Sequence, residues 1–366
     1  MNTVDLSFEI EDITAFHLAF TDQPGYWEDY RGGGAAAAES ARFEFREGWQ
    51  TVYPRRVEAM LLRVTLKDGT VGWGESNTPI GPEVTALVCD RLVLPMAKGR
   101  PFEDPQVLWN FLYDAQRGRG YAAGFYLDAL AALDIAVWDA LGKRLDKPLA
   151  ALLSDATRQF IPAYLSGLRQ ASLAGRIEAM NDWADRGLRG IKIFLDGDLD
   201  AGLAELAALQ EAGGDKIEQW MVDTLWMCRG DTARRAKSDF GKLGARFLEC
   251  PLQPENLQGH RELLVEPGAP IALGEHFRTH YQTAAWFDEP RALDIYQPDV
   301  GRTGLSDGLR QMAAARAAGI PSTPHMGSGL AVFQAATLHF AAVCGDECLQ
   351  EYQAGLAERA ALVSET

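Results

Sequence analysis

The sequence is poor in cysteine, and its cysteines form no recognisable motif. Only five occur in 366 residues, and no two of them make a Cys-x-x-Cys pair. A disulfide framework needs an even set of cysteines, and a zinc knuckle needs closely spaced pairs. Neither class is therefore suggested, and the cysteine usage fits a reducing compartment.

Positive charge is also scarce. The 35 lysines and arginines are outnumbered by 51 aspartates and glutamates, which gives a formal net charge of −16. Proteins that bind nucleic acid or anionic membranes rely on positive charge. We therefore expect neither nucleic acid nor a membrane as a partner, and an anionic substrate would need a local cluster of lysine, arginine or metal.

Signals for export and for membrane insertion are missing as well. The first residues, MNTVDLSFEIED, carry acids where a signal peptide carries basic residues. No apolar run reaches the roughly 18 residues that a membrane-spanning helix needs. We predict a cytoplasmic protein.

Two sets of motifs typical of common enzyme classes are absent. No G-x-G-x-x-G or G-x-x-x-x-G-K-[ST] follows a β-rich run, so the usual phosphate-binding loops of open-sheet nucleotide folds are missing. None of the six histidines forms the His-x-His pair with which barrel zinc hydrolases usually begin. This speaks against that class.

Residues 1–150 mix strand and helix patterns, which predicts an α+β domain. Segments 8–20 and 57–75 are β-rich, and the second contains a Lys-Asp-Gly turn typical of a hairpin. Helical patterns cover roughly 81–98, 104–114 and 122–145. Between the strands, a glycine- and alanine-rich stretch predicts a substrate-covering loop near 22–50, with Tyr26, Trp27 and Arg31 available for substrate binding.

From residue 151 onward, short β-rich runs alternate with alanine-rich helical stretches. Eight runs can be recognised, at 161–166, 190–195, 219–225, 245–250, 270–275, 293–298, 320–325 and 347–352. Eight strands separated by helices predict a parallel α/β barrel over 151–366, and an open doubly wound sheet is the competing arrangement.

A polar residue capable of chemistry lies near the end of seven of these runs: Lys192, Asp223, Glu249, Glu275, Asp299, His325 and Glu351. From Asp223 onward the steps are 26, 26, 24, 26 and 26 residues, which is one βα unit per step. In a barrel these side chains would ring the mouth where active sites of this fold are found. Any single carboxylate could instead cap the following helix.

The residue types in this ring suggest particular roles. Asp223, Glu249 and Glu275 are three hard carboxylates that suit Mg²⁺ rather than Zn²⁺. Asp299 could hold one imidazole nitrogen of His325 and leave the other facing the barrel axis.

Two further residues keep alternative roles. Lys192, in the middle of a strand, binds an anionic substrate oxygen or only neutralises the carboxylates. His276, directly after Glu275, points into the site to bind substrate or caps a helix.

Seven segments together resemble the enolase superfamily, in its mandelate racemase and muconate lactonising branch. They stand in that family's order: GWGES (72–76), ALDIAVWDALGK (132–143), VDTLW (222–226), FLECP (247–251), LGEH (273–276), YQPDVGRTG (296–304) and TPHMGSG (323–329). The resemblance covers essentially the whole chain. It implies an N-terminal α+β capping domain over a (β/α)7β TIM-like barrel.

The resemblance also implies roles for individual residues. Asp223, Glu249 and Glu275 would bind Mg²⁺, a His325–Asp299 dyad would be catalytic, and Glu351 would hydrogen-bond the substrate carboxylate. The chemistry implied is removal of a proton α to a carboxylate by a His or Lys base.

One departure from the family pattern bears on the reaction. The family often has Lys-x-Lys on the second barrel strand, with the second lysine as a base, whereas this sequence has Lys192-Ile193-Phe194. Racemisation commonly uses bases on both faces of the carbon, and only one clear base is present. We therefore favour a dehydratase that acts on an aldonate or aldarate.

Other expectations accompany this reading. A racemase, epimerase or cycloisomerase with the same chemistry is the alternative, and a non-catalytic sugar-acid-binding barrel is a lesser one. Symmetric homo-oligomers are common, so a homo-oligomer is expected. Family members usually continue beyond the eighth strand, which raises the expectation that the natural chain extends past Thr366.

Overall fold

The computed structural model describes residues 4–20, 42–327, 329–353 and 355. Its first sheet is antiparallel, in the order β5-β4-β1-β6, and comes entirely from the N-terminal region. The strands are β1 (Phe8–Phe20), β4 (Val57–Leu66), β5 (Val71–Ser76) and β6 (Pro101–Phe102). The predicted hairpin at 57–75 is therefore β4 and β5, joined by the expected turn.

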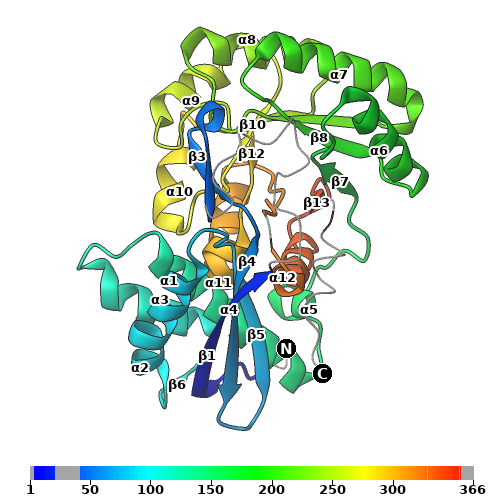
Figure 1. The fold of residues 1–366 in the computed structure, drawn as a ribbon. Helices are drawn as coiled ribbons and strands as arrows, with labels where there is room; N and C mark the ends of the chain where they lie inside the picture. The colour runs from blue at the N-terminus through cyan, green and yellow to red at the C-terminus, as the bar shows by residue number, and fades with distance from the viewer. Residues whose placement is uncertain (1–3, 21–41, 328, 354, 356–366) are drawn as a thin grey trace.

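The helices of this region cover one side of that sheet. They are α1 (Pro82–Val88), a π-helical turn η2 (Cys89–Val93), α2 (Leu94–Ala97), α3 (Pro105–Arg117) and α4 (Phe125–Leu145). The single helix predicted over 81–98 is thus three consecutive pieces. Figure 1 shows this sheet and α1 to α4 grouped at one end of the molecule, with α6 to α9 at the other.

Helix α4 lies unusually close to strand β5, and two glycines explain why. A Cβ on Gly72 would lie 2.0 Å from the carbonyl oxygen of Ala136, and one on Gly74 would lie 1.8 Å from that of Ala132. No side chain larger than hydrogen fits there. The alternating glycines of the GWG motif therefore let the alanine face of α4 pack directly on the strand backbone.

The second sheet is parallel and curls into the barrel. Its order is β12-β11-β10-β9-β8-β7-β13. The strands are β7 (Ala163–Ser166), β8 (Gly190–Phe194), β9 (Gln219–Asp223), β10 (Phe247–Glu249), β11 (Ile271–Leu273), β12 (Ile295–Tyr296) and β13 (Gln350–Gln353). This is the predicted TIM-like barrel, and each of these strands lies within or overlaps one of the predicted runs.

The run at 320–325 differs from the prediction. It makes a single bridge, between Ser322 and Tyr296, and forms no extended strand. Pro321 and Pro324 lack the N–H groups that a hydrogen-bonded ladder needs, which explains the difference. The segment still lies beside β12, because the N–H of His325 donates to the carbonyl of Pro298.

Helices alternate with the barrel strands as expected. They are α5 (Leu149–Leu153), α6 (Leu173–Asp185), α7 (Leu199–Gly213), α8 (Gly230–Lys242), α9 (Leu257–Leu264), α10 (His280–Phe287), α11 (Val300–Ala317) and α12 (Ala331–Ala341). A short 3-10 turn, η3 (Gly214–Lys216), follows α7. Within the described ranges, no helix has both the length and the apolar character needed to cross a membrane.

The loop predicted near 22–50 is in part a regular element. Residues 43–54 form a hairpin of β2 (Phe43–Arg46) and β3 (Thr51–Pro54), joined by the 3-10 turn η1 (Glu47–Trp49). Trp49 in that turn is buried against Phe194 of the barrel. The alternation of Phe43, Glu44 and Phe45 is a strand pattern, which the adjoining glycine-rich stretch obscures.

A buried carboxylate joins the N-terminal helix α4 to the barrel helix α11. Asp134 of α4 accepts a hydrogen bond of 2.9 Å from the backbone N–H of Ser306, next to the kink at Gly304. Trp138, one turn further along α4, donates to the Ser306 hydroxyl over 3.0 Å. Burial raises the pKa of Asp134 from 3.8 to about 7, because the ionised form is poorly solvated there.

This pKa predicts that Asp134 makes stability depend on pH. A carboxyl with a raised pKa in the folded state contributes stability at low pH, and that contribution is lost as pH rises through about 7. As pH rises from 5.5 to 8.5, we expect the variant Asp134→Asn to gain stability relative to the wild type by about 2 kcal/mol, most of it below pH 7. Urea unfolding of both proteins at pH 5.5 and 8.5 measures the free energy of unfolding. The same change with pH in the variant and in the wild type would contradict the raised pKa of Asp134.

Candidate functional site

His325 and Asp299 make the central contact of the site. The imidazole Nδ1 lies 2.8 Å from Asp299 Oδ2, and Nε2 lies 2.8 Å from Glu275 Oε2. Asp299 directly precedes α11 and is fully buried, and His325 lies in the segment between α11 and α12. If Asp299 accepts the Nδ1 proton, Nε2 is the nitrogen that can take up or release a proton.

Lys192 lies at the centre of the carboxylates. It comes from the middle of β8, and its Nζ lies 2.8 Å from Glu249 Oε1, 2.8 Å from Glu351 Oε1 and 3.8 Å from Asp223 Oδ2. Burial disfavours the charged form, yet the negative charges of Glu249 and Glu351 raise the pKa of Lys192 well above its usual range. The side chain is therefore a buried ammonium group.

Asp223, Glu249 and Glu275 come from three neighbouring strand ends. Asp223 ends β9, Glu249 ends β10, and Glu275 follows β11 by two residues. Glu249 shares a cluster of possible metal ligands with Asp223, and a second such cluster with Glu275. Within each cluster the ligand atoms lie within 4.8 Å of one another, so the three acids form one continuous group.

The electrostatics of this group fit a cation. Burial raises the pKa of Asp223 well above its usual range, and the charges of Glu249 and Glu275 add to the effect. Burial also raises the pKa of Glu249. In contrast, the charge and hydrogen bond of His325 outweigh burial and hold the pKa of Glu275 below its usual range.

A count of charges supports the same conclusion. Five carboxylates gather here: Asp223, Glu249, Glu275, Asp299 and Glu351. Among the residues that the structure describes, the cations facing them are Lys192, Arg302 and a protonated His325. With all five carboxylates ionised, two negative charges remain in a buried site, and buried charges persist only when they are compensated. Oxygen ligands with this surplus suit a hard divalent cation.

His276, next to Glu275 in the sequence, lies among aromatic rings. Its ring stands edge-on to Trp226 at 4.9 Å and packs on Phe277 at 4.0 Å. Neither ring nitrogen has a hydrogen-bond partner, and burial lowers the pKa of His276 to about 3. His276 thus packs among aromatic rings, and the N-cap of α10 is Thr279. A role of His276 in substrate binding stays a prediction.

The structure therefore gathers seven of the predicted site residues at one mouth of the barrel. They are Lys192, Asp223, Glu249, Glu275, Asp299, His325 and Glu351. Three others, Tyr26, Trp27 and Arg31, lie outside the described residues. The carboxylate of Glu351 is also held by a backbone hydrogen bond, since the N–H of Met326 donates to its Oε2 over 2.8 Å.

Several residues of the site were not singled out from the sequence. Gln297 donates to Glu249 Oε2 over 2.8 Å, and Trp226 donates to Glu275 Oε1 over 3.2 Å. Asn77 donates to Asp299 Oδ2 over 2.6 Å. Gln297 had a usable signal, because it lies two residues before Asp299 and therefore on the same side of an extended chain. Asn77 had none, since it comes from the other sheet.

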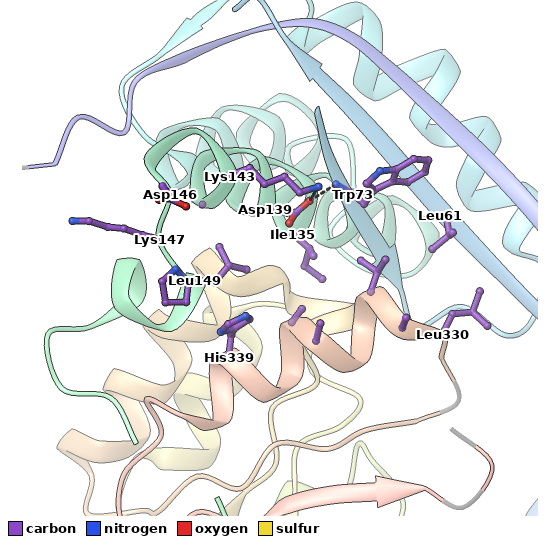
Figure 2. Close-up of a pocket in the computed structure, with 16 residues that line it drawn as sticks. Leu61, Trp73, Ile135, Asp139, Lys143, Asp146, Lys147, Leu149, Leu330 and His339 are labelled. Carbon is purple, nitrogen blue, oxygen red and sulfur yellow. Dashed lines mark hydrogen bonds and ion pairs between the residues drawn. The ribbon is translucent and has the colours of Figure 1, made fainter. Parts of the chain in front are cut away.

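A separate cavity of about 950 Å³ lies between the N-terminal sheet and α12. Figure 2 shows its walls, with Leu61 and Trp73 on one side and His339 on the other. Asp139 in its wall accepts from the backbone N–H of Trp73 over 2.8 Å and pairs with Lys143 at 2.9 Å. None of the site residues described above lines this cavity, so the chemistry is assigned to the barrel mouth.

The fold and the polar ring together define a capped barrel protein with its site at the strand ends. Two family profiles match this chain. Residues 49–154 match "Mandelate racemase / muconate lactonizing enzyme, N-terminal domain", and residues 175–365 match "Enolase C-terminal domain-like". The chain belongs to the mandelate racemase and muconate lactonizing enzyme family of the enolase superfamily.

Individual relatives agree with this membership. A solved structure of an enolase-superfamily member from Agrobacterium tumefaciens is 32% identical, with a TM-score of 0.88, over 97% of this chain and 90% of that one. D-galactarolactone cycloisomerase of Agrobacterium fabrum is 28% identical over 77% of this chain and 74% of its own length. Arabinonate dehydratase of Saccharolobus solfataricus is 27% identical over 75% and 74%, respectively. The chain is therefore similar to sugar-acid enzymes of two reaction types, a dehydratase and a cycloisomerase.

Proposed function

We propose that this protein is a Mg²⁺-dependent dehydratase of an aldonate or aldarate. It removes the proton α to the carboxylate and eliminates the β-hydroxyl, which gives a 2-keto-3-deoxy sugar acid. The observation that carries the proposal is that the site offers one base, His325, which Asp299 holds at 2.8 Å. On β8, Phe194 stands at the position where the family pattern often has a second basic residue.

The roles of the dyad follow from its geometry. Asp299 accepts the Nδ1 proton of His325, which fixes the tautomer and stabilises the imidazolium form. Nε2 then takes the α-proton of the substrate. In the structure Nε2 also lies 2.8 Å from Glu275 Oε2, and a carboxylate oxygen accepts only from a protonated Nε2. Nε2 must give up this contact and its proton before it can take the α-proton.

Asp223, Glu249 and Glu275 are the proposed ligands of Mg²⁺. When bound, the ion supplies a Lewis acid that withdraws charge from the substrate carboxylate. Lys192 is placed to donate to an anionic oxygen of that carboxylate. Its Nζ donates a hydrogen bond to Glu249 Oε1, and its contact with Glu351 Oε1 at 2.8 Å is an ion pair. Glu351 is proposed to hydrogen-bond the substrate as well.

Elimination needs a proton on the leaving oxygen. The imidazolium of His325 returns the α-proton to the β-hydroxyl on the same side of the substrate, the C–O bond breaks, and water leaves. The resulting enol becomes the 2-keto acid. Phe194 is 4% exposed and packs in one cluster with Trp49, so it offers no proton to a second face.

The domain boundary and the role of each domain are also proposals. We place the boundary near residue 150, with residues 1–150 as the capping domain and residues 151–366 as the barrel that carries the site. The separation of the two sheets supports it. Tyr26, Trp27 and Arg31 are proposed to contact the distal part of the sugar.

A substrate screen tests the dehydratase reaction. Purified protein with Mg²⁺ is incubated with a panel of aldonates and aldarates, and 2-keto acid is measured by its semicarbazone absorbance. We expect keto acid from at least one of these acids, with loss of the product signal on chelation of the metal. A protein that exchanges the α-hydrogen in D₂O and interconverts two epimers, without any keto acid, would replace this function by racemisation.

The relative named as a galactarolactone cycloisomerase favours one second candidate. Opening of a sugar lactone uses the same removal of an α-proton, but the ring oxygen leaves in place of a hydroxyl. A parallel panel of aldarolactones separates the two reactions. Consumption of a lactone, with no reaction of any open-chain acid, would favour the cycloisomerase.

A further inference from the structure

The N-terminal sheet reaches the catalytic centre directly, through one residue. Asn77 follows the last residue of β5, and its side chain amide donates to Asp299 Oδ2 over 2.6 Å. This is the same oxygen that His325 Nδ1 contacts at 2.8 Å. Asn77 is 4% exposed and lies 222 positions before Asp299 in the sequence.

Asn77 occupies a slot that the barrel leaves open for it. Its backbone N–H donates to the carbonyl of Gly301 over 2.9 Å. A Cβ on Gly301 would lie 2.7 Å from that nitrogen, and a Cβ on Gly327 would lie 2.6 Å from the side chain Nδ2. One glycine follows Asp299 by two residues and the other follows His325 by two, so both partners of the dyad border the slot.

Among the described residues, the contact from Asn77 is one of two side-chain hydrogen bonds made by the Asp299 carboxylate. Oδ2 serves both Asn77 and His325, whereas Oδ1 is buried and has no hydrogen-bond partner. Arg302 is further away, with its Nε 3.7 Å from Oδ2. Because rotation about the last side chain torsion of aspartate is soft, a second donor on the same oxygen is needed to hold the carboxylate toward His325.

The same strand holds the other end of the segment that carries His325. Glu75 lies two residues before Asn77, and it accepts from the backbone N–H of Leu330 over 2.6 Å and of Phe333 over 2.9 Å. These N–H groups belong to the start of α12, which a carboxylate stabilises. The end of β5 therefore contacts the barrel both before His325 in the sequence, at Asp299, and after it, at the start of α12.

We propose that Asn77 is a positioning residue for the Asp299–His325 dyad, so that proton transfer requires the N-terminal sheet to be seated on the barrel. The proposal rests on the proposed function, because the base it orients is His325. Asn77 acts on Asp299 and through it on the imidazole.

The variant Asn77→Leu tests this role, because leucine has the same branching and number of heavy atoms as asparagine and lacks the donor. We expect kcat, and the rate of α-hydrogen exchange in D₂O, to fall roughly 10- to 100-fold, while KM changes less than about threefold. Asn77→Ser, which keeps a donor, is expected to recover part of the loss. A Leu variant with wild-type kcat would overturn the proposal.

A matched control separates positioning from packing. Thr78, the next residue, is buried, and its hydroxyl contacts that of Ser76 at 2.9 Å without touching the dyad. We expect Thr78→Val to lower the melting temperature at least as much as Asn77→Leu, with kcat unchanged. Equal losses of kcat in the two variants would mean that the effect is structural, and the proposal would fail.

A spectroscopic measurement keeps the test independent of substrate. An imidazole N–H bonded to a carboxylate gives a far-downfield proton resonance, which is assigned here by its absence in His325→Asn. We expect this resonance to move upfield or broaden in Asn77→Leu and to stay in place in Thr78→Val. An unchanged resonance in Asn77→Leu overturns the positioning role, whereas failure of every sugar acid to react overturns only the proposed function.

Discussion

Replacement of His325 by asparagine is expected to stop formation of 2-keto acid and exchange of solvent deuterium at the α-carbon. The Nδ1 atom of His325 lies 2.8 Å from Asp299 Oδ2, and its Nε2 atom faces the carboxylate group, 2.8 Å from Glu275 Oε2. Asparagine is too short to keep both contacts and cannot accept a proton at neutral pH. Removal of a general base costs kcat about 10³-fold or more in such a site.

The measurement combines product assay with proton NMR of the recovered substrate. His339→Asn is the matched control, because its ring lies on α12 and accepts a backbone hydrogen bond from Ala150, away from the dyad. Asp299→Asn is expected to retain the imidazole in an unfavourable tautomer and to lose kcat more than KM. If His325→Asn still washed deuterium into the substrate, another residue would have to be the base.

The barrel site was largely predictable because its geometry follows from the repeat of one βα unit. Steps of 24 to 26 residues place Asp223, Glu249 and Glu275 at successive strand ends, and the structure has them there. Parallel strands put their carboxyl ends on one side of the sheet, so equal spacing becomes spatial convergence. Lys192 was visible for a related reason, since a lysine in the middle of a buried strand requires partners.

Features that depend on long-range packing were less visible. The seventh run forms a bridge and not a strand, because two prolines remove its donors. The β2–β3 hairpin was read as loop, and it is fixed by the burial of Trp49 against Phe194, which lies 145 positions later in the chain. The sequence placed His276 beside Glu275 but not the orientation of its ring, which depends on contacts with Trp226 and Phe277.

Asn77 illustrates the limit of spacing arguments. Its position after GWGES says only that a strand ends there, and its partner belongs to a different sheet. The sequence does show a glycine two residues after each member of the dyad, Gly301 in QPDVG and Gly327 in PHMG. Such glycines permit close approach of another chain segment, but they do not say which segment it is.

The second large effect is expected from Glu249→Gln, which should abolish both metal binding and turnover. Glu249 is fully buried, belongs to both clusters of possible metal ligands, and directs its two oxygens to Lys192 and Gln297 at 2.8 Å each. The glutamine removes one of the two surplus negative charges and turns an N–H₂ group toward one of these donors. We expect affinity for Mg²⁺ to fall by about 100-fold or more, with no keto acid formed at millimolar metal.

Metal binding must be read separately from activity, because a buried substitution can also weaken the fold. Calorimetric titration with Mg²⁺, and electron paramagnetic resonance with Mn²⁺ as a probe, report the site without substrate. Glu205→Gln is the matched control, since Glu205 is also buried and pairs with Arg176 at 2.8 Å between α6 and α7, outside the barrel mouth. It should lose stability and keep wild-type affinity for the metal. Unchanged Mg²⁺ affinity in Glu249→Gln, together with loss of affinity on substitution of His17, Glu58 or Glu83, would move the metal to that other cluster and remove the assignment.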